Sequence, residues 1–335
     1  MATDAPTITA IIPTFNRCHL LPRAVKSVLS QTHRDVVIHI LDNASTDDTP
    51  TVVKQLMRIN SQIKCTRHDA NIGLVQNFCH GLAAVSTPYF SFLCDDDWLA
   101  PGFYASAIAN FNRHEDAGFC GGLTRLVLAD GSEVHTPKRL DRCGMFKPGE
   151  IFLYTSSSYP PITGLVFRTD AVQSIGGLDP SVGIAFDVDL ELRIAAAYRV
   201  VFDPADVAVV TIADDTATAT VSSLSLLHSA RSITNKLCLI PGLEPPTVAI
   251  LVNRLRTRAW LEGALSVRDG RIDDAREAAR ILRESGASGR AAAVTAGAYL
   301  VDSTPIAPPV LRTLARARGA LMRSTRTFQA TRRKR

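Results

Sequence analysis

Three consecutive aspartates, Asp95, Asp96 and Asp97, form the most informative polar cluster of this sequence. They follow residues 89–94, an apolar run with the composition of a buried strand. Adjacent carboxylates there repel one another and resist desolvation unless a divalent cation neutralises them, and their hard oxygens suit Mg²⁺ or Mn²⁺. The cluster therefore predicts a metal site for a phosphorylated ligand. The alternative is a turn in which Asp97 caps a helix beginning near Pro101.

Four other polar segments follow predicted strands or begin a predicted helix. They are Pro13-Thr14-Phe15-Asn16-Arg17, Asp42-Asn43-Ala44-Ser45-Thr46-Asp47, Asn71-Ile72-Gly73 and Phe186-Asp187-Val188-Asp189-Leu190-Glu191-Leu192-Arg193. Ligands of open α/β sheets bind outside the carboxyl ends of the strands, so this order of strand and polar segment points to a binding site. Ordinary turns and helix caps are the alternative interpretation of each segment.

Asp187 is the candidate general base, because it stands at the start of a predicted helix over residues 187–197. On that helix Asp187 and Glu191 share a face, and the i,i+4 spacing predicts a structural ion pair between Asp189 and Arg193. A helix cap is the alternative role for Asp187.

Residues 7–120 alternate short apolar runs with helical spacings, which predicts a parallel sheet with helical crossovers. The first strand, residues 7–12, is expected to stop at Pro13. Two late strands are expected at residues 200–202 and 207–212. Beyond about Ser222 the pattern is helical and includes an αα-hairpin around Asp269-Gly270. We therefore expect a domain over residues 1–221, a helical region over 222–305 and a tail over 306–335.

Composition excludes several classes. The apolar fraction is 46% and the charged fraction 21%, as in ordinary globular proteins. No apolar run approaches the roughly 18 residues of a membrane-spanning helix, and the N-terminus lacks the pattern of a secretory signal. The seven cysteines are scattered without a C-x-x-C pair, which argues against zinc and disulfide frameworks and favours a reducing cytoplasm.

Taken together, the motifs resemble those of family 2 glycosyltransferases of the GT-A fold, over about residues 7–215. The matches run in the family's order, with Asp95-Asp96-Asp97-Trp98-Leu99-Ala100-Pro101-Gly102, Asn77 and Gly176-Gly177-Leu178-Asp179 completing the segments above. The resemblance implies an α/β fold of the GT-A, Rossmann-like type, with a mostly parallel sheet flanked by helices. The helical C-terminal extension lies beyond it.

The resemblance also implies a role for each motif. Residues that match the nucleotide-sugar pocket are Pro13, Thr14, Asn16, Arg17, Asp42, Asn71, Gly73, Asp95 and Asp96. Asp95 and Asp97 match the D-x-D element that holds Mg²⁺ or Mn²⁺ on the diphosphate of the donor. Asp187 matches the base that deprotonates an acceptor hydroxyl, with inversion at the anomeric carbon. Gly164 and the Gly176-Gly177 turn match the side that shapes the donor sugar and the acceptor.

Two positions depart from the family. Phe186 stands where a glutamate often precedes the base, and residues 211–216 lack the histidine that many members use to bind metal or diphosphate. Asp214 or Asp215 is a candidate replacement for that histidine.

The basic C-terminal segment bears on location. From Val310 onward basic residues occur without any acidic residue. This segment is either an amphipathic helix on the inner face of the membrane, which would suit a lipid-linked acceptor, or a solvated tail. No nucleic-acid partner is expected, because no binding module accompanies the charge.

The resemblance predicts transfer of a sugar from a nucleotide-diphosphate sugar to a carbohydrate or lipid-linked acceptor, in cell-surface polysaccharide or glycolipid assembly. Two alternatives remain. One is a catalytically silent nucleotide-sugar-binding or scaffold protein. The other is a sugar nucleotidyltransferase, which would need a Gly-rich phosphate loop that residues 13–17 do not provide.

Overall fold

The computed structural model describes residues 7–134, 142–153, 161–212, 221–240 and 243–303. Within this part of the chain, the strands that form one sheet are β1 (Ile8–Thr14), β2 (Val36–Asp42), β3 (Ile63–Arg67), β4 (Tyr89–Phe92), β5 (Trp98–Leu99), β6 (Ala117–Leu128), β7 (Glu133–Val134), β8 (Gly144–Phe146), β9 (Leu165–Arg168) and β10 (Arg199–Ile212).

The helices are α1 (Leu21–Leu29), α2 (Thr49–Ile59), α3 (Leu74–Ala83), α4 (Phe103–Arg113), α5 (Thr169–Ser174), α6 (Phe186–Ala197), α7 (Ser223–Leu237), α8 (Pro245–Asp269), α9 (Ile272–Glu284) and α10 (Ser288–Ser303). Short 3₁₀ turns are η1 (Glu150–Leu153), η2 (Ile162–Gly164) and η3 (Pro180–Ala185).

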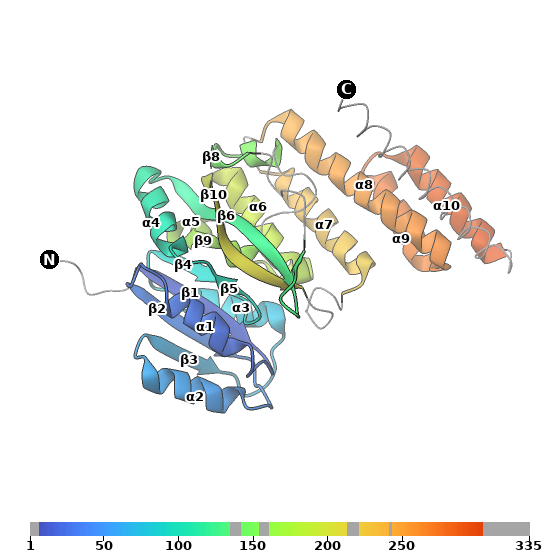
Figure 1. The fold of residues 1–335 in the computed structure, drawn as a ribbon. Helices are drawn as coiled ribbons and strands as arrows, with labels where there is room; N and C mark the ends of the chain where they lie inside the picture. The colour runs from blue at the N-terminus through green and yellow to red at the C-terminus, as the bar shows by residue number, and fades with distance from the viewer. Residues whose placement is uncertain (1–6, 135–141, 154–160, 213–220, 241–242, 304–335) are drawn as a thin grey trace, which may run out of the picture. The chain divides into compact units, whose positions relative to one another are not determined.

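The strands lie in the order β3-β2-β1-β4-β9-β6-β10-β5, with β7 beside β6 and β8 beside β10. The first four strands are parallel, as are β6 and β10, whereas β9 runs antiparallel to both of its neighbours. Figure 1 shows helices α1, α2 and α3 beside the parallel strands. The predicted mostly parallel sheet flanked by helices is therefore confirmed.

Helix α1 illustrates how the sequence builds this layer. Its buried residues include Leu21, Ala24, Val25 and Val28, which fall on one helical face and join the same core cluster as β1 and β2. Burying each large aliphatic side chain contributes about 1.5–3 kcal/mol. This face fixes α1 against the sheet, so that the loop before it lies at the carboxyl end of β1.

Two strand predictions were wrong in their limits. β1 continues through Pro13 to Thr14, which pair with Leu41 and Asp42. The ladder of β1 with β4 ends at Ile11, so Pro13 lies where the strand has one neighbour, and a residue without an N–H is tolerated there.

The two late strands are one strand, β10, which pairs with β6 along nearly its whole length. The pairing register shifts between Asp203 and Asp206 and again between Asp206 and Ala208. The first of these irregularities contains Pro204, but it does not separate the two halves of the strand.

The chain divides into two compact units. The first contains the residues up to Val221 together with Asn235–Val248, and the second contains Ser222–Thr234 and the residues from Ala249 onward. The boundaries that we expect at residues 221 and 305 stay predictions. The segment 213–220 and the residues from 304 onward, which include the predicted tail over 306–335, lie outside the described residues.

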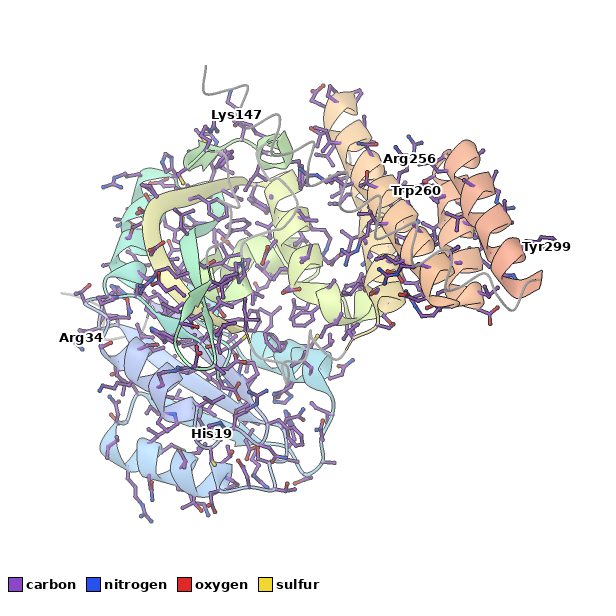
Figure 2. All side chains as sticks on the ribbon, turned by 45° about the vertical axis from the view of Figure 1, so that its right-hand side comes forward. His19, Arg34, Lys147, Arg256, Trp260 and Tyr299 are labelled. Atoms are coloured by element: carbon purple, nitrogen blue, oxygen red, sulfur yellow. The ribbon has the colours of Figure 1, made fainter. Side chains whose placement is uncertain are left out.

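The second unit is helical and has its own core of small and aliphatic side chains from α8, α9 and α10. Arg256 of α8 donates from Nε to the carbonyl of Ser285 at 2.6 Å, and Trp260 packs against this core (Figure 2). No helix in the described parts of the chain combines the length and the hydropathy needed to cross a bilayer.

Candidate functional site

The three aspartates form a tight turn between β4 and β5, which we call the acidic turn (Asp95–Asp97). The Asp97 N–H donates to the Cys94 carbonyl at 3.1 Å and closes the turn. Asp95 is 9% exposed and Asp97 3% exposed. Helix α4 is preceded by Gly102 in a left-handed conformation, so the alternative in which Asp97 caps this helix is wrong.

Both oxygens of the Asp97 carboxylate accept hydrogen bonds from the protein. The Thr163 hydroxyl donates to Oδ2 at 2.7 Å, and the Thr211 N–H donates to Oδ1 at 2.9 Å. Burial, together with the nearby charge of Asp96, raises the pKa of Asp97 to about 7. Burial raises the pKa of Asp95 to about 7 as well. A positive charge placed beside Asp95 and Asp97 would therefore stabilise the ionised form of both carboxylates.

One group of side chains in the described residues has the spacing of a metal site. The ligand atoms of Cys94, Asp96 and Asp97 lie within 4.8 Å of one another, and Asp95 is not part of this group. Burial raises the pKa of the Cys94 thiol well above its usual value, so the thiol stays protonated and is a poor ligand. The remaining carboxylate oxygens fit a hard cation such as Mg²⁺ or Mn²⁺.

Cationic side chains lie around the acidic turn. The Arg17 guanidinium is 3.9 Å from the Asp96 carboxylate. Arg23, on α1, donates to the Asp96 carbonyl and stacks on Trp98, with 4.1 Å between the guanidinium carbon and the ring centroid. The loop after β1 and the first turn of α1 thus each bring an arginine to the acidic turn.

The loop after β1 is held against the loop after β2 by Asn16, whose φ of 55° is left-handed. The Asn16 side-chain oxygen, Oδ1, accepts from the Thr46 backbone N–H at 2.7 Å, and the Asn16 backbone N–H donates to the Ser45 hydroxyl at 3.0 Å. Asparagine tolerates this backbone conformation better than most residues. Thr14 is buried beside Asp95, and its hydroxyl offsets part of the rise in the pKa of that carboxyl. Within the described residues, the Thr14 hydroxyl has no partner at hydrogen-bond geometry.

Asp42 lies at the end of β2 and is 1% exposed. It forms an ion pair with Arg67 and accepts from the Ser45 N–H at 2.8 Å. Asn43 in turn donates to the Asn71 side-chain oxygen at 3.0 Å, which also accepts from the Gly73 N–H at 2.8 Å. Together with the hydrogen bonds of Asn16, these bonds connect three of the predicted pocket segments.

Asp187 lies in the first turn of α6 and keeps part of its surface exposed. Its carboxylate accepts from the adjacent Val188 N–H at 2.8 Å, and no helix-capping hydrogen bond is formed at the start of α6. Burial raises the pKa of Asp187 to about 6. A carboxylate with this pKa is ionised at neutral pH and basic enough to take a proton from a hydroxyl in a transition state.

Aromatic contacts relate Asp187 to the acidic turn. The ring of Phe186 lies 4.8 Å from that of Phe78, which lies 4.9 Å from that of Phe92, the last residue of β4. Helix α6 also packs against η2, which carries Thr163, the donor to Asp97. The start of α6 therefore lies on the side of the sheet where β4 ends.

The two departures from the family have structural counterparts. Phe186 is 3% exposed and belongs to the aromatic contacts just described, so a buried apolar side chain precedes the candidate base. Many members of the family have a histidine in the stretch that corresponds to residues 211–216. Here Thr211, the first residue of that stretch, donates hydrogen bonds to the acidic turn. The suggested replacements, Asp214 and Asp215, lie outside the described residues.

The predicted Asp189–Arg193 ion pair is present, with 2.7 Å between Nη2 and Oδ2. Arg193 also donates to the carbonyls of Ile175 and Gly177, and Lys236 lies 3.3 Å from Asp189. This network fastens α6 to the Gly176-Gly177 turn. Gly164, in η2, has no room for a Cβ, which would lie 2.8 Å from Thr124.

Sequence reasoning missed several residues that hold the site together, namely Arg23, Asn43, Arg67, Thr163 and Thr211. Each makes a long-range contact as a single residue, and a single arginine or threonine has no spacing that reveals it. Two of them were detectable in principle, since Asn43 lies inside a predicted site segment and Arg67 is the last residue of β3.

Comparison with known proteins gives the following relatives. Residues 9–172 match the sequence profile described as Glycosyl transferase family 2. A protein from Nostoc sp. named as an uncharacterized glycosyltransferase is 29% identical over 181 residues, 52% of this chain and 54% of that protein. The GalNAc(5)-diNAcBac-PP-undecaprenol beta-1,3-glucosyltransferase of Campylobacter jejuni is 35% identical over 108 residues, 32% of this chain and 35% of that protein. The chain thus covers about half or less of the length of these two curated relatives.

Solved structures share the fold. S. aureus TarS 1-349 in complex with UDP-GlcNAc has a TM-score of 0.68 at 15% identity, covering 93% of this chain and 92% of that chain. The mannosyltransferase PcManGT from Pyrobaculum calidifontis, in complex with GDP-Man and Mn²⁺, has a TM-score of 0.58 at 18% identity, covering 92% and 87%. At these identities the likeness shows a GT-A-like fold and nothing finer.

Proposed function

Because residues 9–172 belong to glycosyl transferase family 2, we propose that this protein transfers a sugar from a nucleotide-diphosphate sugar to an acceptor hydroxyl, with inversion. The observation that carries the proposal is the pairing of a buried acidic turn at the end of β4 with a separate carboxylate, Asp187, whose pKa is raised to about 6. A transferase of this kind needs both: charge control at the leaving group and a base at the nucleophile.

The donor would lie across the loops after β1, β2 and β3. Pro13 and Thr14 at the end of β1 would line the pocket with Asn16 and Arg17 of the loop that follows. Asp42 at the end of β2, and Asn71 and Gly73 after β3, would line its other side. The hydrogen bonds that join these loops support a preformed pocket for the nucleoside. Arg17 adds positive charge beside Asp96, where the diphosphate of a donor would need it.

In the chemical step, Asp187 would remove the proton from the acceptor hydroxyl. The acceptor oxygen then forms a bond to the anomeric carbon as the bond to the diphosphate oxygen breaks and its electron pair leaves with the diphosphate. Attack from the face opposite the leaving group inverts the anomeric centre. The partial burial of Asp187 favours this role, because a desolvated carboxylate is a stronger base than one in water.

Asp96 and Asp97 are the residues that would hold Mg²⁺ or Mn²⁺ directly, because their oxygens belong to one group. Asp95, predicted as a ligand from the sequence, would lie beside them as a buried carboxylate whose charge the same cation offsets. The cation would supply positive charge against the departing diphosphate. PcManGT, solved with GDP-Man and Mn²⁺, supports a divalent cation in this fold.

The acceptor that we propose is a saccharide on a lipid carrier, in the assembly of a cell-surface polysaccharide or glycolipid at the inner face of the membrane. Support comes from the Campylobacter jejuni relative, whose name specifies an undecaprenol-linked acceptor. The basic residues from Val310 onward would add attraction to anionic lipid.

A donor screen tests the proposal. We expect one of UDP-, GDP- or dTDP-linked sugars, with Mn²⁺, to bind by calorimetry and to release its nucleoside diphosphate when polyprenyl-diphosphate-linked saccharides are added. Product stereochemistry, read from the anomeric proton coupling by NMR, should be inverted. Failure of every donor to bind would contradict the proposal, and retention would contradict the role of Asp187 as a base.

A further inference from the structure

Two side chains from distant parts of the sequence converge on the acidic turn without belonging to any motif. Arg23 lies on α1, and Thr211 lies near the end of β10. Thr211 donates twice: its N–H to Asp97 Oδ1 at 2.9 Å and its hydroxyl to the Asp96 carbonyl at 2.6 Å. The Asp96 carbonyl also accepts from Arg23. We propose that Arg23 and Thr211 are positioning residues that set the shape of the acidic turn for a cation.

Strand pairing fixes the place of Thr211. In the antiparallel ladder of β10 with β5, Val209 pairs with Trp98 and Ala208 pairs with Leu99, directly after the turn. Thr211 follows two residues later on the same strand. Its two donors are therefore held at the turn by the sheet, and their positions do not depend on a flexible loop.

Helix α1 secures the other side. The Arg23 guanidinium stacks on Trp98 and lies 3.4 Å from the Thr211 hydroxyl, so the two positioning residues also contact each other. One turn later on α1, the Ser27 hydroxyl accepts from the Leu99 N–H at 3.0 Å. Just beyond the end of the helix, the Gln31 side chain donates to the Ala100 carbonyl at 2.8 Å. Asp96, Trp98, Leu99 and Ala100 are thus held by α1 and by the residues directly after it.

These bonds orient the polar groups of the turn. The Asp96 carbonyl accepts two donors, so it is held away from a cation. The Asp96 carboxylate lies within 4.8 Å of the Asp97 carboxylate, whose own orientation is fixed by Thr211 and Thr163. Ligands that are already oriented lose little freedom on binding, which raises metal affinity. This inference rests on the proposed function, since it concerns the cation of the same site.

The test is Mn²⁺ binding to the full chain without donor, measured by electron paramagnetic resonance. Thr211→Val removes the hydroxyl but keeps the shape and the N–H, and we expect it to weaken Mn²⁺ binding about tenfold. Thr211→Ser keeps the hydroxyl, and its Mn²⁺ dissociation constant should stay within about twofold of that of the wild type. Arg23→Met should weaken binding similarly. The double variant should lose less than the sum of the two, because both donors act on one carbonyl.

Thr257→Val is the matched control. The Thr257 hydroxyl donates to the Asn253 carbonyl on α8 at 2.9 Å, a comparable bond on another helix, so Mn²⁺ affinity should not change. Unchanged affinity in both Thr211→Val and Arg23→Met, in folded protein that binds Mn²⁺ as wild type, would overturn the positioning role and leave the proposed function intact. Absence of Mn²⁺ binding by the wild type would overturn the cation of the proposed function as well. Equal losses in Thr211→Val and Thr211→Ser would also overturn the inference, since only one lacks the hydroxyl.

Discussion

Asp42 and Arg67 stand opposite each other at the carboxyl ends of β2 and β3, and their side chains form an ion pair. The Asp42 side chain is 2% exposed, whereas that of Arg67 is 45% exposed. The pair therefore joins a buried carboxylate to a cation that solvent reaches. Since the Ser45 N–H occupies the other oxygen of Asp42, the carboxylate has a fixed orientation before any nucleotide binds.

Replacing Arg67 should reveal this arrangement. Arg67→Met leaves the buried Asp42 carboxylate without its cation, and we expect the free energy of unfolding to fall by about 1–3 kcal/mol. The affinity for the donor nucleotide should fall as well, because the orientation of Asp42 is lost. Urea unfolding and calorimetry measure the two effects. The control is Arg276→Met, which removes an exposed ion pair with Asp273 and should change stability by less than about 0.5 kcal/mol. Equal effects of the two substitutions would contradict the role of the buried pair.

Asp187→Asn should separate chemistry from binding. The amide keeps the size of the side chain but cannot accept the proton of the acceptor hydroxyl, so we expect kcat to fall about 10²- to 10⁴-fold. The dissociation constant of the donor should stay within about twofold, because the nucleotide pocket lies on other loops. Asp170→Asn, at an exposed position in the first turn of α5, serves as the control and should retain activity. Full turnover in Asp187→Asn would contradict the base.

The pKa of Asp187 gives the pH dependence of the proposed reaction. Burial raises this pKa to about 6, and the base works in its ionised form. At saturating donor and Mn²⁺, kcat should therefore be level above about pH 7. It should fall about tenfold per pH unit below about pH 6, because protonation removes the active species. A profile of kcat between pH 4.5 and 8.5 measures this fall at low pH. The residual activity of Asp187→Asn should not show the same fall. A fall in kcat only near pH 4 would mean that the base is a carboxyl with an ordinary pKa.

Regular patterns in the sequence were sufficient for the framework of the fold. Apolar runs ending in Asp42 and Asp95 marked the carboxyl ends of β2 and β4, because buried parallel strands are continuously apolar and polar residues begin where burial ends. Leu21, Ala24 and Val28, which lie within the predicted alternation of apolar runs and helical spacings, are buried on one face of α1. Local rules worked here because each element carries its own signal.

Long-range pairing was not accessible in the same way. The antiparallel position of β9 between β4 and β6, and the double contact of Thr211 with the acidic turn, depend on residues far apart in the chain. A β-strand of four residues has no pattern that specifies its neighbours. Phe186 shows the same limit, because only the fold reveals that Phe78 lies against it.

Chelation tests the cation through the acidic turn. Two buried carboxylates and the nearby Asp96 carry like charges, which an added divalent cation would offset while it also attracts the donor diphosphate. We therefore expect EDTA to reduce transfer to background and added Mn²⁺ to restore it, as followed by release of nucleoside diphosphate. Asp97→Ala should remain inactive at the Mn²⁺ concentration that restores the wild type, because a ligand is missing. Unchanged turnover in EDTA would assign the charge on the leaving diphosphate to Arg17 in place of a metal, since that guanidinium lies 3.9 Å from Asp96.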